Sequence, residues 1–274
     1  MECEKVEVFV MLYADYRKLF RTVRTQADVD QLSASGEFDP ELLLVVYTQR
    51  VVRDATSRFY LVKRHARRMF QNWKHGMPLV GLAHEFHFPA VLTAMIVMEE
   101  NRISKKQFWR YLTNVEGIRD TRLREEFRDV LKEDIVYSPE GAARQFARGR
   151  WGEAQLQKWL DGQGILYQSE EELRPLYTKT PDALLASPIR LNGGEKFWFE
   201  SKATFGDPVE IRRHVRRQLK PYSELFGPGL VVYWFGYVED VVYDVPPGVT
   251  LANGEGFTKL RAEFDPTAAP STPT

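Results

Sequence analysis

Two carboxylates and a lysine stand close together in this chain, in the strings Thr180-Pro181-Asp182 and Lys196-Phe197-Trp198-Phe199-Glu200-Ser201-Lys202. Side chains alternate between the two faces of a β-strand, so Glu200 and Lys202 point the same way, and we expect Asp182 to face the same space. Two carboxylates hold Mg²⁺ or Mn²⁺ without filling every coordination position. A bound metal acidifies water, and a nearby lysine orients that water or offsets charge on a phosphate. These strings therefore predict a divalent-metal site on a strand.

Length and composition bound the class of protein. The chain has 274 residues, 43% of them hydrophobic, which is enough for one large domain or two smaller ones. No apolar run approaches the roughly 18 residues that span a bilayer, and the first residues lack the layout of a signal peptide. The single cysteine, Cys3, excludes intrachain disulfides and Cys-based zinc fingers. We therefore expect an intracellular protein with no membrane association.

The first half of the chain has the apolar spacing of helices. This spacing runs from Val6 to about Phe70 and returns between Ile103 and Asp134, and the break Ser138-Pro139-Glu140-Gly141 follows. We therefore predict a helical domain over residues 1–138. Basic residues crowd one part of it, namely Arg50, Arg53, Arg58, Lys63, Arg64, Arg67 and Arg68. Two interpretations stay open, the solvated face of a long helix or a surface that tracks phosphates.

A helix-turn-helix-like unit is predicted within this domain at about residues 77–99. A short helix over 77–86, the break His87-Phe88-Pro89 and a second helix from Ala90 give this layout. If the unit docks on DNA, Pro89, Thr93 and Glu99 would lie near the exposed side of the second helix. That helix carries no Lys or Arg, which argues against recognition of bases.

The second half of the chain mixes helices and strands. We predict a helix over 143–160, a short strand over 165–167, an antiparallel pair joined by the turn Asn192-Gly193-Gly194, a helix over 209–225 and a buried strand over 229–235. This order predicts an α/β core with a mixed sheet over 139–262, in which Tyr233 and Trp234 belong to the core and do not form a stacking platform. Asp207 is expected to cap the helix that follows it. Residues 263–274 are rich in Pro, Ala and Thr and are expected to be disordered.

The motif strings resemble a known family. The spacing from Asp182 to Glu200-Ser201-Lys202 is similar to the PD-(D/E)XK signature of restriction-endonuclease-like nucleases. The longer strings resemble the TPD-motif family, which includes the eukaryotic codanin-interacting nuclease and archaeal relatives likened to Holliday-junction resolvases; they are Lys179 to Asp182, Trp198 to Asp207 and Phe226 to Gly236. The resemblance covers roughly residues 150–237 and implies a mixed α+β/α/β fold, with a restriction-endonuclease-like core after the helical domain.

The resemblance also implies roles for single residues. Asp182 and Glu200 match metal-binding carboxylates, Lys202 matches the catalytic lysine, and the backbone carbonyl of Ser201 is a further candidate ligand for Mg²⁺ or Mn²⁺. Glu153 stands where the superfamily often places another acidic residue, on the helix before the sheet.

Gln218 and Tyr222 fit a Gln-x-x-x-Tyr arrangement that some branches of the superfamily place beside the site. Their spacing of one helical turn lets both side chains face the same groove. Pro221 departs from this arrangement, because a proline inside a helix should kink or end it. The position of Tyr222 therefore depends on how the helix accommodates Pro221.

A basic helix follows the motif. Its arginines, Arg212, Arg213, Arg216 and Arg217, are predicted with Tyr222 to contact a nucleic-acid backbone. The expected activity is that of a Mg²⁺- or Mn²⁺-dependent endo- or exodeoxyribonuclease in the nucleus or cytoplasm, with cleavage of branched DNA by a homodimer as a narrower version. The alternative is a non-catalytic or partner-gated protein that uses a nuclease fold to bind a codanin-like scaffold.

Overall fold

The computed structural model describes residues 11–191 and 193–262, which form two compact units. Among the described residues, the sheet unit consists of residues 11–23, 32–46 and 148–262, and the helical unit consists of residues 24–31 and 47–147. Compactness alone does not establish independent folding, so the predicted domains 1–138 and 139–262 stay predictions. The expected disorder of residues 263–274 and the Asn192 position of the hairpin turn lie outside the described residues.

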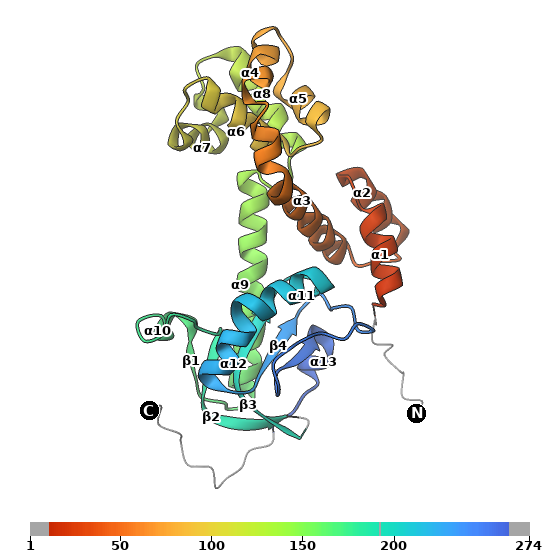
Figure 1. The fold of residues 1–274 in the computed structure, drawn as a ribbon, viewed down its shortest axis with the longest axis vertical. Coiled ribbons are helices and arrows are strands. Elements are labelled where there is room, and N and C mark those ends of the chain that lie inside the picture. The colour runs from red at the N-terminus through yellow and green to blue at the C-terminus, as the bar shows by residue number, and fades with distance from the viewer. Residues whose placement is uncertain (1–10, 192, 263–274) are drawn as a thin grey trace. The chain divides into compact units, whose positions relative to one another are not determined.

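A five-stranded mixed sheet forms the centre of the sheet unit (Figure 1). Its strands are β1 (Tyr167–Ser169), β2 (Ala183–Leu191), β3 (Gly194–Lys202), β4 (Gly229–Tyr233) and β5 (Thr250–Asn253). They lie in the order of the sequence, with β1, β2 and β3 antiparallel and β3, β4 and β5 parallel. The prediction of a mixed sheet is confirmed.

Helices cover both faces of this sheet. Its helical elements are α1 (Tyr13–Thr22), α9 (Pro139–Gly162), α10 (Glu170–Leu173), α11 (Pro208–His214), the π-helical segment η2 (Val215–Leu219), α12 (Lys220–Phe226) and α13 (Gly254–Thr258). Phe199 and Val232 turn to a core shared with α9 and α13. Their strand neighbours Trp198 and Val231 turn to a second core shared with α11, η2 and α12. The strand alternation thus buries β3 and β4 on both sides.

The helical unit is built around one buried hairpin of helices. Its elements are α2 (Gln26–Ser35) and α3 (Pro40–Lys63), which both also contribute to the sheet unit, α4 (Ala66–Lys74), α5 (Leu79–Phe86), α6 (Ala90–Glu100), α7 (Lys105–Thr113), the 3₁₀ turn η1 (Val115–Gly117), α8 (Thr121–Glu133) and the start of α9. The axes of α5 and α6 differ by 114°, as in helix-turn-helix units. In the part of the chain that the structure describes, no single helix is long and apolar enough to cross a membrane; α5 and α6 reach that length and composition only as a bent pair.

The second helix of this hairpin, α6, does not expose the surface that would be needed to contact DNA bases. Thr93 is fully buried in α6, and its neighbours Val91, Ile96 and Val97 belong to the core of the unit. The expectation that Thr93 lies on the exposed side is therefore wrong, because α6 packs on several sides at once. Glu99 is exposed and forms an ion pair with Lys63.

Most of the basic residues between positions 50 and 68 serve internal contacts. Arg58 donates to the backbone carbonyls of Phe86 and His87, at 2.8 Å each, and Arg68 pairs with Glu85. Within the described residues, the exposed Arg64 and Arg67 form no ion pair. Because most of these side chains already contact other residues of the protein, few of them are left to bind phosphates. The segment is therefore better described as a charged helix surface than as a surface that tracks phosphates.

Gly229→Ala is expected to destabilise the sheet unit. The two residues Trp198 and Gly229 are paired across β3 and β4, and a Cβ added at Gly229 would lie 2.0 Å from the indole of Trp198. Because the buried indole has no room to move, we expect the free energy of unfolding to fall by about 1–3 kcal/mol. Thermal and urea unfolding measure this loss.

Gly149→Ala is the matched control. It changes a glycine of α9 whose added Cβ meets nothing within 4 Å, so it should raise stability by about 0.5–1 kcal/mol through helix propensity. Equal effects of the two substitutions would contradict the packing of Trp198 against the backbone of Gly229.

Candidate functional site

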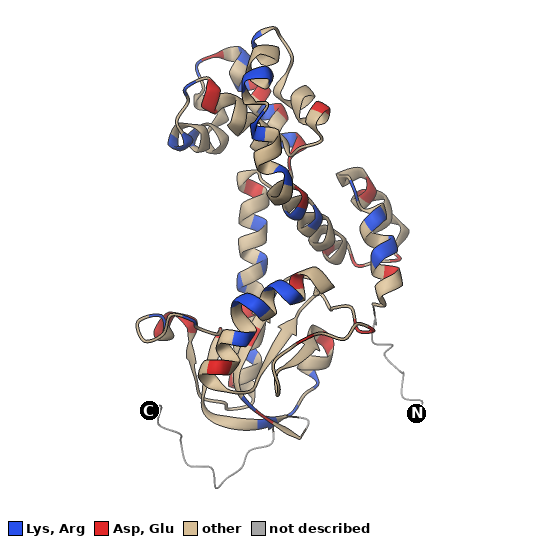
Figure 2. Cartoon of the chain, viewed as in Figure 1, with Lys and Arg blue, Asp and Glu red and all other residues tan. Residues whose placement is uncertain are grey.

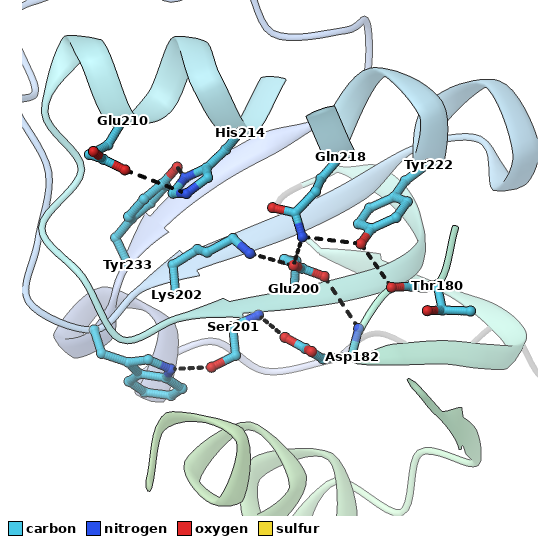
Figure 3. A network of polar contacts seen from close by, with 11 residues as sticks. Thr180, Asp182, Glu200, Ser201, Lys202, Glu210, His214, Gln218, Tyr222 and Tyr233 are labelled. Carbon is cyan, nitrogen blue, oxygen red and sulfur yellow. Dashed lines mark hydrogen bonds and ion pairs between the residues drawn. The ribbon is translucent and has the colours of Figure 1, made fainter. Parts of the chain in front are cut away.

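The predicted carboxylates and lysine come together at the ends of two adjacent strands (Figure 3). Glu200 and Lys202 lie on β3, and Asp182 immediately precedes the pair formed by Ala183 of β2 and Phe199 of β3. The ammonium group of Lys202 donates to Glu200 Oε1 at 2.5 Å, so both side chains occupy one face of the strand. Asp182 is joined to the same strand end through its own backbone N–H, which donates to Glu200 Oε2 at 3.3 Å.

Glu200 is the most deeply buried of these charges, with 2% of its surface exposed. Its Oε1 accepts hydrogen bonds from Lys202 and from the side-chain amide of Gln218 at 3.0 Å. A buried charge is costly unless it is paired and hydrogen-bonded, and these two donors meet that requirement. They also leave Oε2 with only the long bond from Asp182.

Asp182 is under electrostatic stress. Its Oδ2 accepts the backbone N–H of Ser201 at 2.7 Å, and its Oδ1 accepts no hydrogen bond from a described residue. Burial, followed by the charge of Glu200, raises the pKa of Asp182 well above its usual range, and Lys202 acts in the opposite direction. A cation between the two carboxylates would relieve the repulsion that raises this pKa.

The donor set fits Mg²⁺ or Mn²⁺ with two protein carboxylates. Asp182 Oδ1 and Glu200 Oε2 are the under-used oxygens, and hard divalent cations commonly take one or two carboxylates and complete their shell with water and phosphate oxygens. Among residues 11–191 and 193–262, no three or more His, Cys, Asp or Glu side chains are grouped to hold a metal ion. The exposed Glu153 is near enough to raise the pKa of Asp182 but belongs to no such group.

Ser201 links the site to the other face of the sheet. Its hydroxyl accepts the indole N–H of Trp234 at 2.8 Å, while its N–H holds Asp182. Neither contact involves the Ser201 carbonyl, whose role as a metal ligand stays a prediction.

The helix that carries Gln218 changes its hydrogen-bonding pattern next to Pro221. The π-helical segment η2 ends at Leu219 and α12 begins at Lys220, so that Pro221 occupies the first turn of α12. A first-turn residue needs no N–H partner within its helix, which is how the chain accommodates the proline. Gln218 and Tyr222 are consequently in contact, with 3.3 Å between the amide nitrogen and the hydroxyl.

Tyr222 supports the site from inside the protein. It is 3% exposed, and its hydroxyl donates to the backbone carbonyl of Thr180 at 2.8 Å, just before Asp182. Its ring packs edge-on against Trp198, with 5.3 Å between the ring centroids. This position corrects the expectation that Tyr222 contacts a nucleic-acid backbone, because no exposed hydroxyl is left to bind a phosphate.

The four predicted arginines lie on the exposed side of α11 and η2, where Figure 2 shows a run of blue. Arg212 donates to the carbonyl of Pro208 at 2.9 Å, and Arg213 pairs with Glu210. Arg216 and Arg217 form no ion pair with any described residue. These last two guanidinium groups are therefore the more available pair for an anionic ligand.

Asp207 caps this helix, as the sequence predicted. Its side chain accepts the N–H groups of Val209 at 2.7 Å and Glu210 at 3.0 Å. The hydroxyl of Tyr16, from α1, donates to the same carboxylate. The cap fixes the start of the helix whose later turns carry the arginines and Gln218.

A buried histidine beside the site was not singled out from the sequence. His214 Nδ1 lies 2.9 Å from the hydroxyl of Tyr233, and Nε2 lies 3.8 Å from Glu210 (Figure 3). Burial and the charges of Lys202 and Arg213 lower the pKa of His214 to about 3. The i, i+4 spacing of Glu210 and His214 on a helix facing the sheet was the one sequence signal for this pair.

A known family model matches part of this chain. The family described as "Protein of unknown function TPD sequence-motif" matches residues 119–253, just under half of the chain. The resemblance to the TPD-motif family, drawn from the motif strings, is confirmed.

Several vertebrate proteins named CDAN1-interacting nuclease 1 are similar to this chain. The Xenopus laevis protein is 30% identical over 184 residues, which are 64% of this chain and 61% of the relative. The Homo sapiens protein is 30% identical over 181 residues (63% and 64%), and the Gallus gallus protein is 32% identical over 182 residues (63% and 62%). The chain thus matches less than two thirds of the length of each relative. No solved structure matches the chain significantly.

His214 is expected to make the sheet unit sensitive to acid. Its folded pKa of about 3 lies below the unfolded value, so the unfolded state binds more protons as the pH falls below about 6.5. Stability contributed by the neutral ring is complete above pH 6.5 and is lost toward pH 3. Between pH 7 and pH 5 we expect the free energy of unfolding to fall by about 2 kcal/mol from this group.

Urea unfolding at several pH values, for wild type and His214→Gln, measures the effect. In His214→Gln, most of the fall in the free energy of unfolding between pH 7 and pH 5 should be lost. In His75→Gln, which changes an exposed histidine of the helical unit, the fall should remain. If the dependence of the free energy of unfolding on pH is the same in His214→Gln as in wild type, the pKa of His214 is not lowered by folding.

Proposed function

We propose that this chain is a metal-dependent nuclease with a PD-(D/E)XK core that hydrolyses phosphodiester bonds in nucleic acid. The observation that carries the proposal is the buried Glu200 carboxylate, held by Lys202 and Gln218, next to an Asp182 whose pKa is raised by burial and by the charge of Glu200. The name of the relatives, nuclease, supports the same activity. DNA is the substrate that we propose to test first.

Each side chain has a distinct task in the proposed reaction. Asp182 and Glu200 would hold Mg²⁺ or Mn²⁺, which when bound supplies acidified water and neutralises charge on the phosphate. Lys202, already hydrogen-bonded to Glu200, would orient the attacking water and stabilise the charge that develops in the transition state. Gln218 would keep Glu200 in place, and Arg216 and Arg217 would bind neighbouring phosphates of the strand.

Narrower forms of this proposal concern substrate and assembly. Cleavage of branched DNA by a homodimer is one such form, and a DNA substrate would place the protein in the nucleus or the cytoplasm. The alternative function is a non-catalytic or partner-gated interaction protein that binds a codanin-like scaffold. The words "CDAN1-interacting" in the name of the relatives support this alternative.

Asp182→Asn is expected to abolish cleavage, and Lys202→Ala to lower its rate by about 10²–10⁴-fold, the usual contribution of a positioned acid–base group. The assay uses end-labelled single-stranded, duplex, flapped and four-way-junction DNA with Mg²⁺ or Mn²⁺. Lys259→Ala, which removes an exposed ion pair with Glu255, is the matched control and should cleave like wild type. Cleavage by Lys202→Ala at the wild-type rate would refute the role of this lysine.

Titration with Mn²⁺ by calorimetry separates the two functions. A nuclease should bind Mn²⁺ with an affinity that Asp182→Asn lowers strongly and Gln218→Ala lowers by about 10–100-fold, because the amide orients a ligand. Lys259→Ala again serves as the control. A folded wild-type protein that takes up no Mn²⁺ would favour the scaffold function.

A further inference from the structure

A cluster of aromatic rings lies partly exposed on the sheet unit and has no role in the proposed chemistry. We call it the Trp151 patch, formed by Arg148 and Trp151 of α9 and by Trp234 and Phe235 after β4. The indole of Trp151 packs at steep angles against both rings, with centroid distances of 5.7 Å to Trp234 and 6.0 Å to Phe235. The Arg148 guanidinium lies 5.9 Å from the Phe235 ring. Even so, Trp151 stays 45% exposed.

Two hydrogen bonds connect the patch to the candidate site. Trp234 donates to the hydroxyl of Ser201 at 2.8 Å, and the N–H of Ser201 donates to Asp182 at 2.7 Å. The approach of α9 depends on Gly152, because a Cβ there would meet Trp234 at 2.8 Å and the Ser201 hydroxyl at 3.0 Å. The patch is therefore held against the strand end that carries the carboxylates. Trp234 packs against the core that includes Phe199 and Phe257, as predicted, and its ring is also partly exposed. The proposal below departs from the further prediction that Trp234 is not part of a stacking platform.

Strand direction places the patch and the site at the same edge of the sheet. β3 and β4 are parallel, with Lys202 paired to Tyr233 at their carboxyl ends, and Trp234 follows directly. Ligands of open α/β sheets bind at the carboxyl ends of parallel strands. A strand of nucleic acid with one phosphate at Asp182 and Glu200 would bring its neighbouring nucleotide to this edge.

We propose that the Trp151 patch stacks an unpaired base of the substrate next to the phosphate that is cleaved. The substrate class is then nucleic acid with unpaired nucleotides at the cleavage point, such as a single strand or a flap, and not a continuous duplex. The inference rests on the proposed nuclease function. Aromatic rings stack on the faces of unpaired bases, an arginine adds a cation–π contact, and the faces of bases inside a duplex are covered by their neighbours.

The charges around the Trp151 patch indicate on which side of the rings the nucleic-acid strand would lie. A cavity of about 370 Å³ is lined by Trp234 and Phe235 together with the acidic side chains of Glu37, Asp39 and Glu255, which repel phosphate. On α9 the exposed Arg150, which forms no ion pair with a described residue, adds a positive charge close in sequence to Trp151. The phosphate next to the stacked base is therefore expected along α9 and away from the acidic cavity, and Arg216 and Arg217 keep the role proposed above for phosphates on the other side of the site.

Fluorescence anisotropy with labelled DNA tests the proposal in the full-length Asp182→Asn background, which binds without cleaving. Trp151→Ala should weaken binding of a single-stranded and a flapped oligonucleotide by about 5- to 150-fold, and binding of a blunt duplex by less than about twofold. Trp151→Phe keeps an aromatic face and should retain most of the affinity. Quenching of tryptophan fluorescence by the single strand should decrease in both variants, because the indole of Trp151 is removed while that of Trp234 remains.

Tyr13→Ala is the matched control, because Tyr13 is another exposed aromatic residue of the sheet unit with an arginine, Arg17, 5.7 Å from its ring. It should bind all three DNAs like the parent. Unchanged single-strand affinity in a folded Trp151→Ala protein, an equal loss on the blunt duplex, or no binding of DNA at all would overturn the proposal. If binding follows the prediction while wild type cleaves nothing, the nuclease function fails and the stacking site stands. If wild type cleaves and Trp151→Ala keeps its substrate preference, only the stacking site fails.

Discussion

The buried carboxylate of Glu200 is the constraint on which the surrounding structure depends. Because a charge with 2% exposure destabilises the fold unless donors surround it, the helix after β3 must deliver Gln218 to the same oxygen that Lys202 reaches. The π-helical segment and the restart of α12 at Lys220 accomplish this in a helix that contains Pro221. The irregular helix is thus explained by the need to place the side-chain amide of Gln218 within hydrogen-bonding distance of Glu200 Oε1.

The beginning of the chain takes part in the same arrangement. Tyr16 of α1 donates to Asp207, the residue that caps the helix carrying Gln218, and its ring stacks on Phe205 with 5.2 Å between the centroids. The backbone of Met11 is bridged to Val238, beyond the end of β4. The sheet unit therefore includes residues from the first turn of the described chain, far in sequence from the motif strings.

Local patterns in the sequence predicted β2, β3, β4 and the cap, but they missed β5, placed β1 two residues early and did not predict long-range packing. Alternation along β3 placed Glu200 and Lys202 on one face, and an acidic residue before Pro208 predicted the cap at Asp207. The burial of Thr93 depends on helices that surround α6, and the burial of Tyr222 depends on the Thr180 segment. His214 was not singled out because its significance comes from Tyr233 of β4, which is far away in the sequence and contacts it from the face of the sheet that α11 covers.

The electrostatics of the site favour a role in binding a cation over a purely structural one. Burial and then the charge of Glu200 raise the pKa of Asp182, and the charge of Lys202 acts in the opposite direction. Buried ionic groups of this kind rarely stabilise a fold relative to apolar side chains of the same size. A protein that served only as a docking scaffold would gain stability from replacing them. If a divalent cation and an anionic phosphate occupy the site together, as proposed above, the arrangement would become favourable, since each would neutralise charge that the other leaves exposed.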